Sequence, residues 1–121
     1  MNAHTEIDPV LYPINRLRIC TALKAAGATE GGGVDREMKF TVLQELATLS
    51  DAELSEQLGE LQSHGYITRH REYGSSRPKD TVWISLTAVG DAALTKHLSA
   101  LRSIAGATGD DQPDRSDEEQ N

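Results

Sequence analysis

The residues best suited to a specific chemistry are four basic side chains placed around one turn-rich segment. The four are Arg69, Arg71, Arg77 and Lys79. Only two acidic residues fall between positions 69 and 80. Concentrated positive charge attracts the phosphate backbone of nucleic acid, and arginine at a hairpin tip suits a narrow minor groove. The alternative is a solvated hairpin whose charges prevent strand pairing at its edge.

Two strands are predicted to carry these side chains, because hydrophobic residues alternate with a period of two on both sides of the turn. One strand is expected over 66–72 and the other over 81–86, which makes a two-stranded hairpin. We expect Trp83 and Tyr66 to face each other across this hairpin and to pack there rather than stack on bases.

Three helices are predicted before the hairpin. The first covers 14–26 and carries Cys20 on its apolar side. Thr41-x-x-Gln44 and Ser50-x-x-Glu53 are capping-box patterns that open the second and third helices. About two residues separate these two helices, which is the arrangement of a helix-turn-helix motif.

The inward faces of these helices follow from the spacing of their hydrophobic residues. For the second helix they are Phe40, Leu43, Leu46 and Ala47, and for the third helix they are Leu54, Leu58 and Leu61. The outer face of the third helix is then polar and small. Its N-terminus can bind a phosphate through backbone N–H groups, and Ser55 and Gln57 can contact phosphates or base edges.

A long helix is predicted after the hairpin, over about 87–105, with Thr87 as its N-cap. Its apolar stripe is longer than so small a domain can cover by itself. We therefore expect a two-fold dimer in which this helix and an N-terminal segment pack on a second subunit. The residues assigned to that interface are Ile7, Val10, Leu11, Leu94, Leu98, Leu101 and Ile104.

The net charge of −7 in 121 residues is unusual for a nucleic-acid-binding protein, but it is unevenly distributed. From position 105 onward there are six acidic residues and one basic residue, so this tail alone carries −5. We expect one domain over 1–105 and a disordered acidic tail over 106–121. An acidic tail that mimics nucleic acid would compete with it for the basic hairpin, so deletion of residues 106–121 is predicted to tighten DNA binding.

Composition and motifs argue against several other classes of protein. The single cysteine suits a reducing cytoplasm, and no apolar stretch is long enough to cross a membrane. Cys20 and the four histidines show no close metal-ligand spacing, so we expect neither a metal nor another cofactor. No nucleophile elbow or phosphate loop is present, so we do not expect an enzyme.

The ordered set of motifs resembles the MarR-like winged-helix regulators, and more closely the short single-domain winged-helix DNA-binding family related to them. The motifs are Arg16-Leu17-Arg18-Ile19, Phe40-Thr41-x-Leu43, Leu49-Ser50-Asp51-x-x-Leu54-Ser55, Gly65-Tyr66-Ile67, Arg77-Pro78-x-x-Thr81 and Leu86-Thr87-x-x-Gly90. The resemblance covers roughly residues 8–103. It implies a mainly α fold with a small β-hairpin (α+β): a winged helix-turn-helix with a three-helix core, a two-stranded wing and a long C-terminal helix.

The resemblance also implies a dimeric transcription regulator that binds double-stranded DNA through its third helix and its wing. We expect these DNA contacts from Lys39, Thr41, Ser50, Asp51, Ser55, Gln57, Arg69, Arg71, Ser75, Ser76, Arg77 and Lys79. A small-molecule effector at the dimer interface is a further expectation at the family level, with no residue that indicates its identity.

The third helix departs from the family in its charge. Relatives usually carry Lys, Arg, His or Asn around positions where this chain has Glu53, Glu56, Gln57 and Glu60. Glu53 completes a capping box, whereas Glu56 and Glu60 would repel phosphates. The alternative function is therefore a winged-helix protein-interaction module, or an antagonist, that has lost DNA binding.

Overall fold

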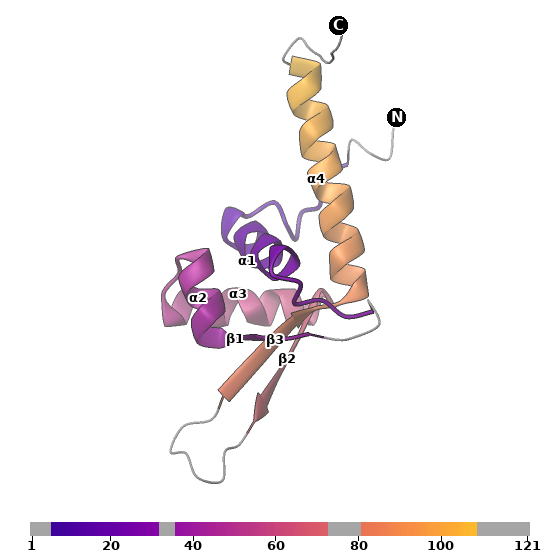
Figure 1. Ribbon diagram of the computed structural model, residues 1–121. Helices are drawn as coiled ribbons and strands as arrows, with labels where there is room; N and C mark the ends of the chain where they lie inside the picture. Colours follow the sequence, from indigo (N-terminus) through magenta and orange to yellow (C-terminus); the bar gives the residue numbers. More distant parts are fainter. Residues whose placement is uncertain (1–5, 32–35, 73–80, 109–121) are drawn as a thin grey trace, which may run out of the picture.

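The computed structural model describes residues 6–31, 36–72 and 81–108. These residues form four helices and a small sheet, and the strands are interspersed with the helices along the chain (Figure 1). The elements are α1 (Ile14–Ala25), β1 (Met38–Lys39), α2 (Phe40–Ala47), α3 (Asp51–Ser63), β2 (Ile67–Glu72), β3 (Thr81–Leu86) and α4 (Ala88–Thr108). The fold is a winged helix, mainly α with a small β wing, as the sequence predicted.

The sheet has three antiparallel strands in the order β1-β3-β2, and not only the two strands that were expected. Met38 pairs with Ile84 in β1 and β3, while Ile67 pairs with Leu86 in β2 and β3. The two residues of β1 pair with residues more than forty positions later in the chain. A local pattern cannot show such a partner.

The hydrophobic core lies between α1, α2, α3 and the inner face of the sheet. Leu54, Leu58 and Leu61 of α3 are fully buried, as their spacing predicted. Cys20 of α1 is buried among them as a small apolar side chain. Burial raises its thiol pKa to about 12, with the nearby Asp8 charge as a second cause, so the thiol is protonated at neutral pH.

The expectation that Leu46 points inward is wrong, since 56% of this side chain is exposed. Leu43 and Ala47 set the inward direction of α2, with Phe40 partly buried beside them. At about 100° per residue, Leu46 lies roughly a quarter turn from that direction. It therefore faces the surface near α1, where it lines a shallow groove.

The two predicted capping boxes have different outcomes. At α3 the Ser50 hydroxyl accepts from the Glu53 N–H at 3.1 Å, and the Ser50 N–H donates to the Glu53 carboxylate at 3.0 Å. The backbone and hydroxyl bonds of Ser50 hold the pKa of Glu53 below its ordinary value. At α2 the prediction is wrong, because the N-cap is Lys39 and no side chain caps this end. Thr41 then lies inside the helix.

Helix α4 starts as predicted, with the Thr87 hydroxyl accepting from the Gly90 N–H at 2.9 Å. Gly90 packs so closely on the residue before β2 that a Cβ there would collide with the backbone carbonyl of Tyr66. The helix runs to Thr108, three residues beyond the expected end, and its C-terminal half projects beyond the core (Figure 1). From 109 onward, the predicted acidic tail lies outside the described residues.

No helix among the described residues is long and apolar enough to cross a membrane.

Candidate nucleic-acid interface

The exposed face of α3 is polar and acidic, and the helix contains no lysine or arginine. Its inner face is fixed by the three buried leucines, so the remaining positions face solvent or neighbouring elements. The exposed side chains are those of Asp51, Ala52, Glu53, Ser55, Glu56, Glu60, Gln62 and Ser63. The N-terminus of this helix is capped, and its first turns lie beside the start of α2 around one groove.

One groove brings together four of the residues that sequence reasoning assigned to DNA contact. Lys39 and Thr41 come from the start of α2, and Asp51 and Ser55 come from the first turns of α3. The groove is completed by Phe40 and by the first residues of β3, Thr81 and Val82. The structure thus places these side chains around one concave surface between the two helices of the helix-turn-helix and the sheet.

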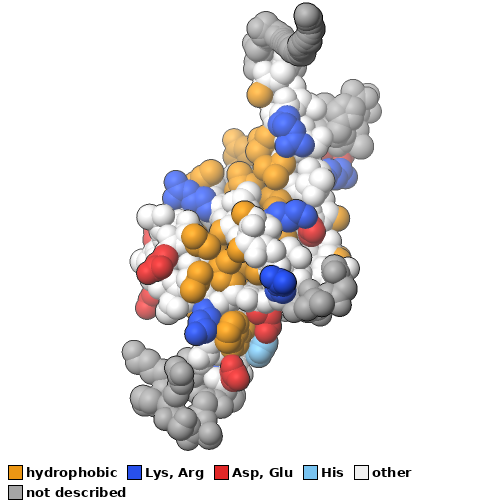
Figure 2. Space-filling model, in the orientation of Figure 1, with side chains coloured by type: hydrophobic (Ala, Val, Ile, Leu, Met, Phe, Trp, Pro, Cys, Tyr) orange, Lys and Arg blue, Asp and Glu red, His pale blue; other side chains and the backbone are white. Residues whose placement is uncertain are grey.

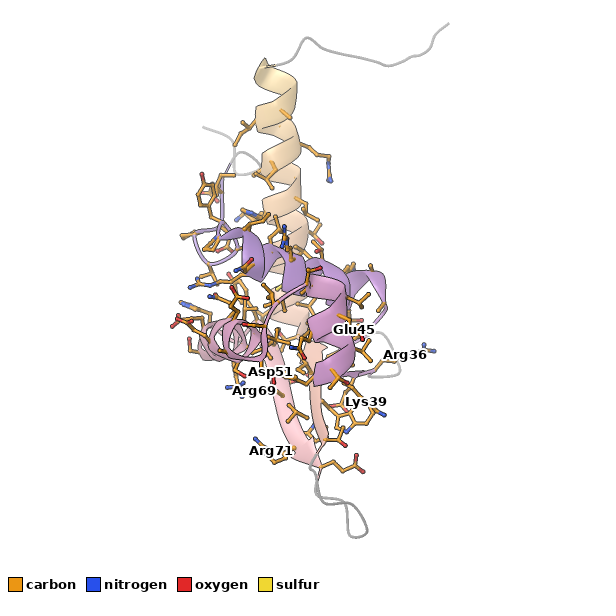
Figure 3. The ribbon with its side chains drawn as sticks, turned by 90° about the vertical axis from the view of Figure 1, so that its left-hand side faces the viewer. Arg36, Lys39, Glu45, Asp51, Arg69 and Arg71 are labelled. Atoms are coloured by element: carbon orange, nitrogen blue, oxygen red, sulfur yellow. The ribbon has the colours of Figure 1, made fainter. Side chains whose placement is uncertain are left out.

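The basic residues of the sheet are divided between its two faces (Figure 3). Arg69 and Arg71 of β2 lie opposite Ile84 and Val82 of β3, and they point to the side of the sheet on which α3 lies. Lys39 lies opposite Trp83, and its ammonium is 5.7 Å from the centre of the indole ring. Lys39 therefore occupies a different face from the two arginines, at the other rim of the interface.

Gln57 has an orientation that the sequence did not reveal. Its side-chain oxygen accepts from Nε of Arg16 in α1 at 2.8 Å, and Nη1 of Arg16 donates to the Val10 carbonyl at 3.3 Å. The Gln57 side chain is therefore held against α1 and turned from the outer face of α3. This arrangement does not favour the base contact expected for Gln57, because its side-chain oxygen already accepts from Arg16.

The Ser50 hydroxyl likewise has a partner within the chain, because it accepts from the Glu53 N–H and caps α3. Arg69 donates from Nε to the side-chain oxygen of Gln62 at 2.8 Å, which joins β2 to α3. Arg71 is exposed one alternation further along β2. The remaining predicted contacts, Ser75, Ser76, Arg77 and Lys79, lie outside the described residues.

The expected pairing of Trp83 with Tyr66 is wrong. Trp83 lies opposite His70 in the sheet, and its indole N–H donates to the Glu72 carboxylate at 2.9 Å. Tyr66 precedes β2, and the register of the hairpin starts with Ile67 opposite Leu86. Continued by one residue, this register puts Tyr66 opposite Thr87, four positions along the sheet from Trp83, so the two rings are not cross-strand partners.

The residues assigned to a dimer interface do not share one environment. Leu11 and Leu94 are fully buried in their own chain. Val10 and Leu98 are partly buried against the same core, whereas Ile104 is 43% exposed. Ile7 and Leu101 are half-buried. Only the outer members of the set are therefore available to a second subunit, because the core has already covered the others.

A buried polar network that sequence reasoning missed connects the N-terminal segment to α4 and β2. The Asp8 N–H donates to Nδ1 of His97 at 3.0 Å, and the Tyr66 hydroxyl donates to the Asp8 carboxylate at 2.6 Å. His97 is 1% exposed, and burial lowers its pKa. Burial, together with the bond to Asp8, raises the pKa of Tyr66 to about 12. No local sequence pattern indicates that Asp8 meets these two partners.

Within the described residues, no three His, Cys, Asp or Glu side chains are grouped so that they could hold a metal ion.

Comparisons with known proteins agree with this geometry. A family model described as a winged helix DNA-binding domain matches residues 33–105. No curated protein is similar enough in sequence to count as a match.

Two solved structures share the fold at low sequence identity. One is the YusO protein from Bacillus subtilis, with a TM-score of 0.59 and 17% identity over 84% of this chain. This chain spans 60% of the length of YusO. The other is ZitR from Lactococcus lactis, a zinc-responsive MarR family member, with a TM-score of 0.54 and 17% identity over 88% of this chain and 68% of ZitR. The fold is thus shared with a MarR family member, and the chain belongs to the winged helix DNA-binding domain family.

Proposed function

We propose that this protein is a transcription regulator that binds duplex DNA as a homodimer. In this proposal α3 enters the major groove, and the basic side of β2 lies along the flanking backbone. The observation that carries the proposal is the Arg69 guanidinium beside the exposed outer face of α3, where it donates to Gln62 at 2.8 Å, with Arg71 on the same side of β2 (Figure 3). Arginine side chains are well suited to phosphate oxygens.

The charge of the described interface supports contact through the sheet more than through the helix. Arg69 and Arg71 supply positive charge on the side of the sheet that faces α3, and Lys39 adds a cation at the other rim. The carboxylates of Glu56 and Glu60 are exposed on α3 itself. Binding of the backbone is therefore assigned mainly to β2, and α3 contributes its N-terminus, Ser55 and its close approach to base edges.

A comparison of two double variants tests the proposal on DNA binding. In Arg69→Ala/Arg71→Ala, the slope of log affinity against log salt should become shallower by about 0.9 for each phosphate contact that is lost. The matched control is Arg18→Ala/Arg102→Ala, which removes the same charge from the exposed faces of α1 and α4. The two variants are compared by fluorescence anisotropy on a random-sequence duplex. Equal losses in both variants would contradict an interface at β2 and α3.

The dimer is proposed from the apolar surface of α4 and the segment before α1. Hydrophobic side chains are visible at the surface over α1 and along α4 (Figure 2). Leu98 and Leu101 are half-buried, and Ile104 is exposed on the part of α4 that projects beyond the core. We assign Ile7, Val10, Leu98, Leu101 and Ile104 to the contact, with Leu11 and Leu94 supporting them from within the core. A two-fold dimer would place two α3 helices about 34 Å apart, which is one turn of DNA.

The dimer is tested by sedimentation velocity. Leu101→Glu/Ile104→Glu should sediment as a monomer at concentrations where the unmodified chain is a dimer, because two buried carboxylates would lie at the interface. Arg102→Ala, which lies between them in sequence, is the control for a change on the same helix. A monomeric unmodified chain would contradict the dimer and would leave the proposed DNA surface to be judged separately.

A further inference from the structure

The exposed face of α3 lacks a basic residue of its own, but one guanidinium from the neighbouring strand lies across it. Nε of Arg69 donates to the side-chain oxygen of Gln62 at 2.8 Å. Nη2 of the same arginine would be 3.8 Å from a Cβ placed on Gly59. Gly59 and Gln62 are three positions apart and so lie on one side of the helix. The Arg69 side chain therefore crosses from β2 onto α3 (Figure 3).

The chemical state of this guanidinium suits a further contact. Its partner Gln62 is neutral, and among the described residues no carboxylate forms an ion pair with Arg69. A guanidinium has five N–H donors, and the bond to Gln62 uses the one on Nε. The two Nη groups form the planar fork that matches a pair of acceptors. Arg69 thus presents a guanidinium without an ion-pair partner among the described residues, and a paired donor edge, at the outer face of α3.

We propose that Arg69, held by Gln62 and seated over Gly59, is the residue that recognises guanine in the DNA site. This inference rests on the proposed function, in which α3 enters the major groove. There, guanine presents two adjacent acceptors, N7 and O6, which an arginine fork can bind together. Arg69 is then the specificity-determining residue, and Gln62 is a positioning residue that acts through it.

The surroundings of the guanidinium explain why α3 itself needs no arginine. Gly59 has no side chain, and those of Ser55 and Ser63 are small. A long side chain from β2 therefore has room to lie over this part of α3. The bond to Gln62 fixes a long flexible side chain before DNA arrives, and this reduces the conformational entropy lost on binding. Arg71, two residues further along β2, lies opposite Val82 and is assigned to the phosphate backbone.

The test is selection of bound duplexes from a random pool, followed by measured affinities for the selected site and for its single-base variants. The unmodified chain should select a guanine at one fixed position in each half-site. Arg69→Lys keeps the charge but not the fork, so its preference for guanine at that position should fall by about 5- to 150-fold. Arg71→Ala should lower the affinity for all sequences alike and keep the guanine preference.

Gln62→Ala tests the positioning role. It should weaken the preference at the same base position, while the salt slope and the thermal midpoint stay as in the unmodified chain, because no charge and no buried contact is removed. A structural bond between strand and helix would instead lower the thermal midpoint and leave the base preference as it was.

The outcomes separate the inference from the proposed function. If the unmodified chain binds no duplex at 50 mM salt, a low ionic strength chosen to favour phosphate contacts, the proposed function and this inference both fail. If it binds duplex but Arg69→Lys keeps the full guanine preference, or no guanine is selected, the inference alone is overturned. Loss of the preference in Arg69→Lys and in Gln62→Ala, with retention in Arg71→Ala, supports it.

Discussion

Helix α3 and strand β2 border the same proposed DNA surface, yet they carry opposite kinds of side chain. The helix exposes carboxylates, hydroxyls and small residues, whereas the strand carries Arg69 and Arg71. The difference follows from what each element must do within the fold. The N-terminal acid of α3 at Glu53 belongs to its cap, and its leucines belong to the core. The comparison teaches that the charge for a helix in the groove can come from a neighbouring strand.

The largest expected effect comes from the buried face of α3, because its packing on the core decides which side chains of the helix face solvent. Leu58 is fully buried, so Leu58→Ala should lower the free energy of unfolding by about 2–5 kcal/mol through lost burial and the cavity that remains. The exposed Glu56→Ala on the same helix should change it by less than about 0.5 kcal/mol. Urea unfolding at one fixed protein concentration measures both. Similar losses in the two variants would show that the faces of α3 have been assigned wrongly.

A second change would reduce the difference in charge between α3 and β2. Glu56→Gln/Glu60→Gln removes two exposed carboxylates from α3, and DNA affinity should rise by about 2- to 5-fold for each, as for other exposed charges. Glu6→Gln, far from α3 and paired with Lys96 on α4, is the control. If DNA binding were detectable only in the double variant, the rival function, an interaction module that has lost DNA binding, would be favoured.

A third change concerns the glycine beneath Arg69. A Cβ at Gly59 would be in ordinary contact with Arg69, so Gly59→Ala should stabilise the protein by about 0.5–1 kcal/mol through helix propensity alone. Gly90→Ala is the opposite case, because its Cβ would meet the Tyr66 carbonyl. The midpoint of thermal unfolding should rise in Gly59→Ala and fall in Gly90→Ala, because only the Cβ at position 90 would collide with neighbouring atoms. Destabilisation by Gly59→Ala would mean that Arg69 lies closer to α3 than described.

The smallest expected effect lies away from this surface, in the polar network at α4. Burial lowers the pKa of His97 in the folded protein below its value of 6.5 in the unfolded chain. Between these two pKa values the unfolded state binds more protons than the folded state does. The contribution of His97 to the free energy of unfolding is therefore fully present above pH 6.5 and is lost as the pH falls toward the folded pKa. His97→Gln should flatten this dependence in urea unfolding at pH 5.5 and 7.5, whereas the exposed His64→Gln should not. An unchanged pH dependence in His97→Gln would contradict the role assigned to this imidazole.

The parts of the fold that the sequence predicted are those set by neighbouring residues. The Ser50 and Glu53 cap, the spacing of Leu54, Leu58 and Leu61, and the limits of β3 all depend on short-range patterns, and the structure confirms them. The start of α2 was misplaced because Thr41 and Gln44 form the same letter pattern as a capping box without its geometry.

The contacts that were missed join positions far apart in the chain. Asp8 and His97 are 89 residues apart, and Asp8 and Tyr66 are 58 residues apart. The bond from Arg16 that holds Gln57 against α1 spans 41 residues. Periodicity reports which side of an element is apolar, but it carries no information on which polar side chains meet across elements. The sequence therefore predicted which elements surround the candidate site, but not which polar side chains meet between them.

The most direct test of DNA binding is the affinity of the unmodified chain for a random-sequence duplex, followed from 50 to 200 mM salt as is usual for phosphate-dominated binding. The account predicts measurable binding at the lowest salt and a straight-line fall of log affinity with log salt, because cations of β2 displace counterions from phosphates. Absence of binding at the lowest salt, or an affinity that does not change with salt, would contradict it.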